Sequence, residues 1–164
     1  MKYRFCLPAS ICLLLSNAFA QDPLKVAPEA YQLQFENEWV KVVRVHYGPH
    51  QKIPAHDHPQ HATAYVYLND SGPVIFRHIG MDFGPITRPE TRAGSFRVFK
   101  ANREVHEVEN TSDLPSDFLR VEFKTKMIDE KTLHGRYHRA SRPEGENHQQ
   151  QQFDDRQIRV TRLV

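Results

Sequence analysis

The run GPHQKIPAHDHPQHATAYVYL, from Gly48 to Leu68, carries the strongest structural signal in the chain. Its second half is rich in β-branched and aromatic residues, which are typical of a β-strand. His56 and His58 are separated by one residue just before this half. Because side chains two apart in a strand point to the same face, we expect both imidazoles on one side, where they can share a metal ion.

Short strand patterns recur along most of the chain, with turn-forming residues between them. The clearest has Leu119, Val121 and Phe123 alternating with charged residues, which is typical of a half-buried antiparallel strand. A helical turn is expected only over residues 128–133. The sequence therefore predicts an all-β antiparallel sandwich or barrel. The predicted strands cover residues 32–47, 62–68, 74–79, 95–99, 105–108 and 118–124.

The first residues have the pattern of a signal peptide. Lys2 and Arg4 precede an apolar run over residues 5–15, and a small-residue cleavage pattern follows at residues 18–20. We expect residues 1–20 to be removed and the mature protein, beginning at Gln21, to be periplasmic or secreted. The segment also contains both cysteines of the chain, so no disulfide is expected in the mature protein.

The charge of the predicted mature protein is balanced. The chain has 22 basic and 20 acidic residues, and loss of Lys2 and Arg4 leaves 20 of each. A neutral protein with mixed charges gives no reason to expect nucleic acid as a partner, or a membrane once the signal peptide is removed. A small molecule is the expected partner.

The C-terminal part of the chain differs in composition from the rest. Residues 128–152 are rich in Arg, His and Gln and are predicted to be a polar linker. Residues 153–164 read as a strand that resembles residues 35–45: the pattern of Phe, acid, apolar, base, Val and Arg recurs at a constant offset of 118. The repeat is either the vestige of a second domain or an edge strand that pairs with this chain or with a partner.

A third ligand is expected from His106, which lies 48 residues after His58 and so on a different strand. Inward positions on neighbouring strands of a barrel face one interior, so His106 can return to the same cavity. Glu104 and Asn110 share its strand parity and could orient a ligand or substrate. For Glu104 the expected role is an ordinary solvent-facing carboxylate.

These residues resemble two sequence motifs of the cupin superfamily. Gly48 followed by His56-x-His58 is similar to the first motif, and Gly94 with His106-x-x-x-Asn110 is similar to the second. The residues around them resemble a group of small exported bacterial cupins. The resemblance implies that residues 21–127 form a jelly-roll (cupin) barrel, with the remainder as an extended C-terminal tail.

The chain departs from the cupin pattern at one ligand. The Glu expected after the second His is replaced by Ala62 or Thr63. Some cupin dioxygenases use three histidines, so the resemblance still implies a site made of His56, His58 and His106. Three neutral imidazoles suit a divalent transition metal, which is Fe, Zn, Mn, Ni or Cu, and leave coordination positions open.

Other residues are candidates for secondary roles. His61 or Gln60 can add a ligand if Pro59 breaks the strand register. The remaining histidines have no spacing that couples them to the pair and are predicted to lie at the surface or to be satisfied locally: His46, His50, His78, His134 and His138. The residues expected to line the pocket or support the ligands are Asn110, Thr63, Tyr65, Tyr67, Phe76 and Phe96.

Two classes of function remain after motif analysis. The predicted mature chain has no cysteine nucleophile, no Gly-x-Ser-x-Gly elbow and no phosphate-binding Gly-rich loop. One class is a small metal-dependent enzyme, oxygenase-like or isomerase-like. The other is a non-catalytic periplasmic binding or stress-associated module that needs no metal. A homodimer is plausible in either case, because cupin barrels commonly pair.

Overall fold

The computed structural model describes residues 21–126, 134–138, 149–154 and 158–163. The predicted signal peptide and the predicted helical turn at residues 128–133 lie outside these ranges. No helix within them is long and apolar enough to cross a membrane. The regular structure of the described residues is antiparallel strand, apart from one short helix, α1 (Pro23–Val26), before the first strand.

Most of the described strands form two antiparallel sheets. The four-stranded sheet contains, in spatial order, β3 (Lys52–His58), β8 (Glu104–Asn110), β5 (Val74–His78) and β6 (Ile86–Arg88). The six-stranded sheet contains β1 (Tyr31–Glu36), β2 (Val40–Tyr47), β9 (Ser116–Phe123), β4 (Ala62–Tyr67), β7 (Phe96–Phe99) and β10 (His134–His138). This arrangement confirms the predicted jelly-roll class.

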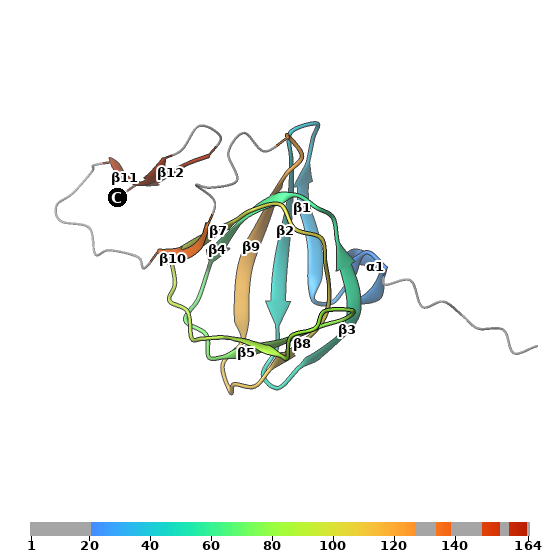
Figure 1. The fold of residues 1–164 in the computed structure, drawn as a ribbon. Helices are drawn as coiled ribbons and strands as arrows, with labels where there is room; N and C mark the ends of the chain where they lie inside the picture. The colour runs from blue at the N-terminus through green and yellow to red at the C-terminus, as the bar shows by residue number, and fades with distance from the viewer. Residues whose placement is uncertain (1–20, 127–133, 139–148, 155–157, 164) are drawn as a thin grey trace, which may run out of the picture.

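The two sheets curve around a common interior (Figure 1). Tyr31 and Val45 from one sheet and Ile53, Val74 and Val108 from the other meet there as a buried apolar cluster. Among the described strands no ladder of hydrogen bonds joins the two sheets, so the predicted barrel is a sandwich and is not closed. The open geometry leaves room for a cavity between the layers.

The alternation in β9 is as predicted, but its faces are assigned differently. Phe118, Arg120 and Glu122 point inward and are buried, whereas Val121 and Phe123 lie on the outer face of the sheet. A period of two cannot by itself tell which face is inside. Here the charged side chains of Arg120 and Glu122 lie in the interior, and the apolar outer face is covered by another part of the chain.

That cover comes from the C-terminal hairpin, β11 (Gln149–Asp154) and β12 (Arg159–Leu163). Ile158 is buried against the outer face of β4 and β7, with Phe153 and Val160 packed beside it. β12 therefore pairs with β11 and not with an edge of either large sheet. β10 and the first residues of β11 fall within residues 128–152, where composition predicted only linker.

Candidate metal and ligand site

The three predicted histidines converge between the sheets. His56 and His58 come from β3, and His106 lies on β8 directly opposite His56. All three are buried, with exposed fractions of 0%, 2% and 3%. Their ring centroids are 4.8 to 5.1 Å apart, and one nitrogen from each lies within 4.8 Å of the others. This geometry can hold one metal ion.

The local structure of β3 sets the orientation of His56. The β3–β8 register shifts between Ile53 and His56, where Pro54 has no N–H to contribute. His56 Nδ1 lies 2.8 Å from the Pro54 carbonyl oxygen, which can only accept, so this nitrogen is the donor. The lone pair is therefore on Nε2, which faces the interior.

The lone pair of His56 Nε2 accepts a hydrogen bond from a tyrosine that was not predicted from the sequence. The Tyr31 hydroxyl lies 2.8 Å from His56 Nε2 and donates to it, and it accepts in turn from Tyr47, 2.7 Å away. Burial raises the pKa of Tyr31 well above its usual value and that of Tyr47 to about 12, so both phenols stay protonated at neutral pH. No spacing links Tyr31 to the histidines, since only the strand order brings β1 close to β3.

The other two histidines offer nitrogens without partners. Nδ1 of His58 and Nδ1 of His106 are buried and have no hydrogen bond within the described part of the chain. Burial lowers the pKa of both well below the usual value, with Arg120 contributing for His58 and His56 for His106. Neutral imidazoles with unbound nitrogens are the donor set that divalent transition metals prefer, so the residues fit such an ion.

Two further side chains join this group, contrary to the sequence prediction. His78 on β5 lies opposite His106, and Glu104 lies opposite His58. Glu104 Oε2 is 3.7 Å from His106 Nδ1, and His78, Glu104 and His106 form a second set that could hold an ion. Glu104 therefore lines the site and is not an ordinary solvent-facing residue. The pairing of β5 with β8 places His78 beside the triad, and the spacing of the histidines along the sequence does not reveal this pairing.

Other predicted site residues lie elsewhere. His61 lies in the loop after β3, with Nδ1 3.7 Å from Glu122 Oε2, and neither it nor the exposed Gln60 joins the ligand groups. Thr63 donates to the His61 carbonyl, and Phe96 packs in the outer cluster. Phe96 misses the pocket because the residues of β7 alternate between the two faces of the sheet. Thr63 shares the inner face of β4 with Tyr65 and Tyr67, but it is not among the residues that line the cavity.

Asn110 stabilises the backbone and does not face the pocket. Its side-chain amide donates to the carbonyl oxygens of Gly48 and Leu114 at 2.9 Å each, with a longer contact to Tyr47 at 3.3 Å. Its oxygen accepts from the Ser112 N–H at 3.1 Å. The residue thus fastens the end of β8 to the end of β2. This gives the asparagine of the second motif a structural role that needs no contact with a ligand.

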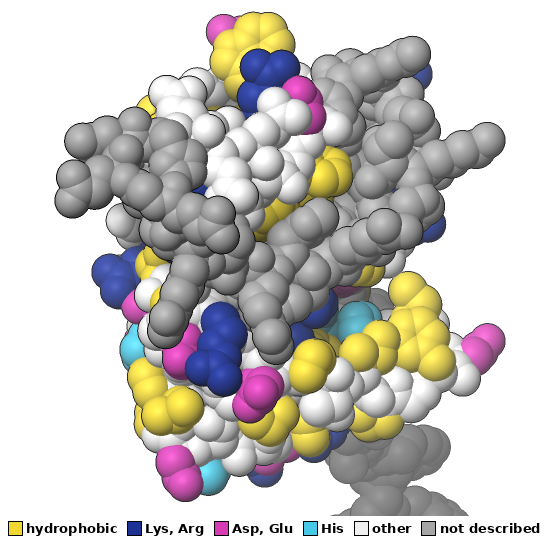
Figure 2. Space-filling view, turned by 90° about the vertical axis from the view of Figure 1, so that its left-hand side faces the viewer, with side chains coloured by type: hydrophobic (Ala, Val, Ile, Leu, Met, Phe, Trp, Pro, Cys, Tyr) yellow, Lys and Arg dark blue, Asp and Glu magenta, His cyan; other side chains and the backbone are white. Residues whose placement is uncertain are grey.

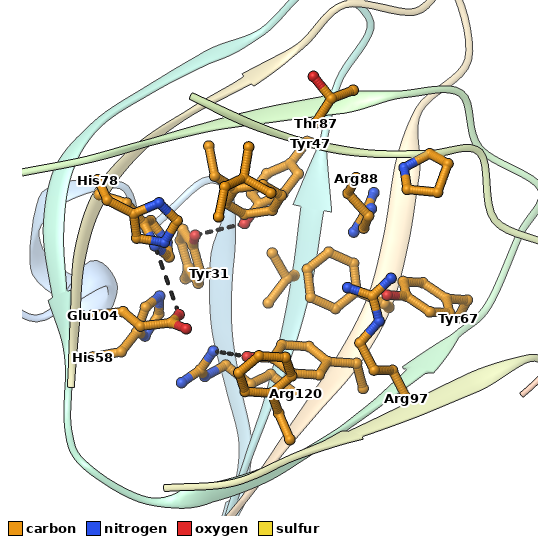
Figure 3. A pocket seen from close by; sticks show the side chains of 18 residues that line it. Tyr31, Tyr47, His58, Tyr67, His78, Thr87, Arg88, Arg97, Glu104 and Arg120 are labelled. Carbon is orange, nitrogen blue, oxygen red and sulfur yellow. Dashed lines mark hydrogen bonds and ion pairs between the residues drawn. The ribbon is translucent and has the colours of Figure 1, made fainter. Parts of the chain in front are cut away.

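A cavity of about 230 Å³ extends from the histidines between the sheets. Tyr65, Tyr67 and Phe76 line it, as predicted. Three arginines that were not predicted line it as well: Arg88, Arg97 and Arg120. Figure 3 shows His58, His78 and Glu104 on one side of this pocket and Arg88 and Arg97 on the other.

The three arginines differ in the hydrogen bonds that their guanidinium groups make. Arg120 donates to Glu122 Oε1 at 2.9 Å and to the Tyr65 hydroxyl at 2.6 Å. Burial alone would lower the pKa of Arg120, but Tyr65 and Glu122 outweigh it and hold that pKa above its usual value. Arg88 donates to Ser116, yet the Nε atoms of Arg88 and Arg97 are buried without a hydrogen bond among the described residues.

No family model matches the sequence, and no curated protein matches it significantly. Among solved structures, a cupin domain from Bordetella pertussis is 24% identical, with a TM-score of 0.49 over 58% of this chain and 92% of its own. A protein with a double-stranded β-helix domain from Klebsiella pneumoniae is 21% identical, with a TM-score of 0.41 over 67% and 82%.

A third likeness is to an RmlC-like cupin from Desulfovibrio desulfuricans, at 22% identity and a TM-score of 0.40, over 60% of this chain and 87% of the other. These likenesses concern the fold alone. The two antiparallel sheets, with the paired histidines of β3 facing His106 of β8, form a fold of the jelly-roll class.

Proposed function

We propose that this protein binds a divalent transition metal through His56, His58 and His106 and binds a small molecule in the adjoining cavity. The observation that supports this most directly is the convergence of three buried, neutral imidazoles, two of which have an unbonded nitrogen. Such an ion, when bound, supplies Lewis-acid or redox chemistry at its open positions. His78 and Glu104 lie beside the ligands, where they can position a substrate or hold a proton.

Metal analysis of the purified protein tests this proposal. We expect close to one transition-metal ion per chain after growth in supplemented medium, and loss of that ion in His58→Ala. His61→Ala is the matched control, because His61 is nearby in sequence but outside the ligand groups. Wild-type protein without bound metal, which also fails to bind Zn, Ni, Mn, Cu or Fe in calorimetric titration, would refute the metal site.

One observation favours a metal-free binding module as the second candidate. The Tyr31 hydroxyl already satisfies His56 Nε2, so the site is partly satisfied without an ion. An ion that bonds to His56 Nε2 has to replace this hydrogen bond. If no metal binds, the same cavity remains available for a small molecule, and oxygen-uptake assays will show no activity.

The chemistry of the cavity also indicates the class of small molecule. The unbonded guanidinium nitrogens of Arg88 and Arg97 favour an acidic group, because a charged donor buried without a partner is costly. Tyr67, Phe76 and Phe118 provide apolar walls. At the rim, Ile86 is exposed, and Phe83 contacts His78 with ring centroids 5.2 Å apart. We propose a small carboxylate with an aromatic or apolar body.

Figure 2 is consistent with an apolar approach to the site. Hydrophobic side chains gather on the lower part of this face, beside a histidine, in the region where β5 lies in Figure 1. The exposed apolar residues of the β5–β6 connection and its flanks are Ile79, Met81, Phe83 and Ile86. A ligand with an apolar body can contact this rim before its acidic group reaches the arginines.

Titration with benzoate, and with neutral benzamide for comparison, tests the ligand class. We expect benzoate to bind more tightly, and Arg97→Met to weaken it by about 10- to 100-fold, the effect of losing a charge-assisted hydrogen bond of ~1.5–3 kcal/mol. Arg92→Met, outside the pocket, should leave binding unchanged. Titrations of metal-free protein separate recognition by arginine from coordination by a metal. Equal binding of benzamide would contradict the proposal.

A further inference from the structure

The C-terminal hairpin repeats the first hairpin of the domain in its strand pairing as well as in its sequence. In β1–β2 the paired residues include Gln32 with Arg44 and Phe35 with Val42. In β11–β12 the corresponding pairs are Gln150 with Arg162 and Phe153 with Val160. Adding 118 to every pair in the first ladder gives the second, and the register shift between Leu33 and Phe35 recurs between Gln151 and Phe153.

The two hairpins also share an apolar face. Phe153, Ile158 and Val160 of the second hairpin pack on the outer face of the six-stranded sheet, against Ala62, Ala64, Phe96 and Val98. Their counterparts in the first hairpin are Phe35, Val40 and Val42. In the first hairpin Phe35 is 52% exposed. Phe35, Val40 and Val42 belong to neither apolar cluster of the described residues. In the first hairpin the face that its copy uses for packing is thus only partly covered, with Phe35 exposed and Val40 and Val42 half-buried.

We propose that the outer face of β4 and β7 is a docking surface for the β1–β2 hairpin of a second copy of this chain, and that the β11–β12 hairpin occupies this surface in its place. The proposal follows from the shared register: a surface that accepts Phe153 and Val160 in a bulged hairpin can accept Phe35 and Val42 in the same geometry. Reciprocal docking of two copies would give a closed two-fold dimer. The C-terminal hairpin keeps the chain monomeric.

The hairpin copy is on the side of the molecule seen in Figure 2, together with β10. Its opposite face does not contribute to either apolar cluster: Leu163 is 73% exposed. Substitutions on the two faces therefore separate a change in docking from a general change in the hairpin. This difference provides a matched control within the same hairpin.

The test compares the oligomeric state of full-length variants by sedimentation over a range of concentrations. We expect the wild type and Leu163→Glu to be monomeric. The double variant F153E/I158E releases the hairpin and should form a dimer as concentration rises. Adding Phe35→Glu to that variant should restore the monomer. Circular dichroism checks that each variant is folded.

If the charged pair does not fold, F153A/I158A weakens the same contact more gently and should give a smaller dimer fraction. A dimeric wild type, or released variants that stay monomeric at every concentration, would overturn the proposal. So would a dimer of the released variant that persists after Phe35→Glu. Metal content is not needed for any of these measurements, so the result does not depend on the proposed function.

Discussion

Replacing Glu122 with Gln should destabilise the fold more than replacing any exposed acid. Arg120 and Glu122 form an ion pair of 2.9 Å, and their side chains are only 6% and 3% exposed. Removing one partner of a buried pair typically costs ~3–5 kcal/mol because the other charge stays buried without compensation. Gln keeps an acceptor for the Arg120 guanidinium, so we expect the lower end, about 3 kcal/mol.

Urea denaturation measures this loss. With an m-value of about 2 kcal/mol/M, the midpoint should fall by about 1.5 M. Glu36→Gln is the matched control, because its 2.9 Å pair with Lys124 is exposed and screened by solvent, so its loss should shift the midpoint far less. The double variant R120M/E122L should recover part of the loss, since no charge stays unpaired. If Glu122→Gln costs no more than Glu36→Gln, the buried pair is not what stabilises this wall of the cavity.

Three other predictions concern the site and its support. Tyr31→Phe frees His56 Nε2 and should tighten metal binding about 2- to 10-fold by calorimetry, the value of one hydrogen bond of ~0.5–1.5 kcal/mol; unchanged affinity would argue that the ion does not use this nitrogen. Asn110→Ala should lower the free energy of unfolding by about 3 kcal/mol, because several buried backbone groups lose their partner; a loss below 1 kcal/mol would contradict the fastening role. Metal-free protein should lose stability as pH falls below about 6.5, because the unfolded chain protonates its histidines there while burial lowers the pKa of His58 and His106 in the folded state. His106→Gln should make this dependence shallower in urea titrations at several pH values.

The fold class could be predicted because strand patterns and turn residues are local properties of the sequence. The triad could also be predicted, since His56 and His58 share a strand face and the motif resemblance selects His106. The inward face of β9 could not be identified, because alternation does not say which side is inside. Arg120 lines the cavity there with Glu122 buried beside it, and the apolar side is covered by a hairpin from much further along the chain.

The remainder of the site depends on which strands are neighbours. Tyr31 reaches His56 because β1 lies near β3, and His78 reaches His106 because β5 pairs with β8. Neither neighbour relation is encoded in spacing along the chain. Glu104 had the correct parity, but parity alone does not distinguish a cavity-lining carboxylate from a solvent-facing one. Its position opposite His58 decides this.

The unequal support of the ligand strands has a kinetic consequence. β8 is hydrogen-bonded on both sides. β3 is the edge of its sheet, and among the residues that the structure describes its outer side has only the short bridge from Gln21 to His56. Edge strands open locally at a lower free energy than central ones, so their amides should exchange hydrogen faster. One fraying event of β3 would release His56 and His58 together and leave His106 in place. An ion held here would therefore escape at a rate set by the opening of one strand and not by global unfolding.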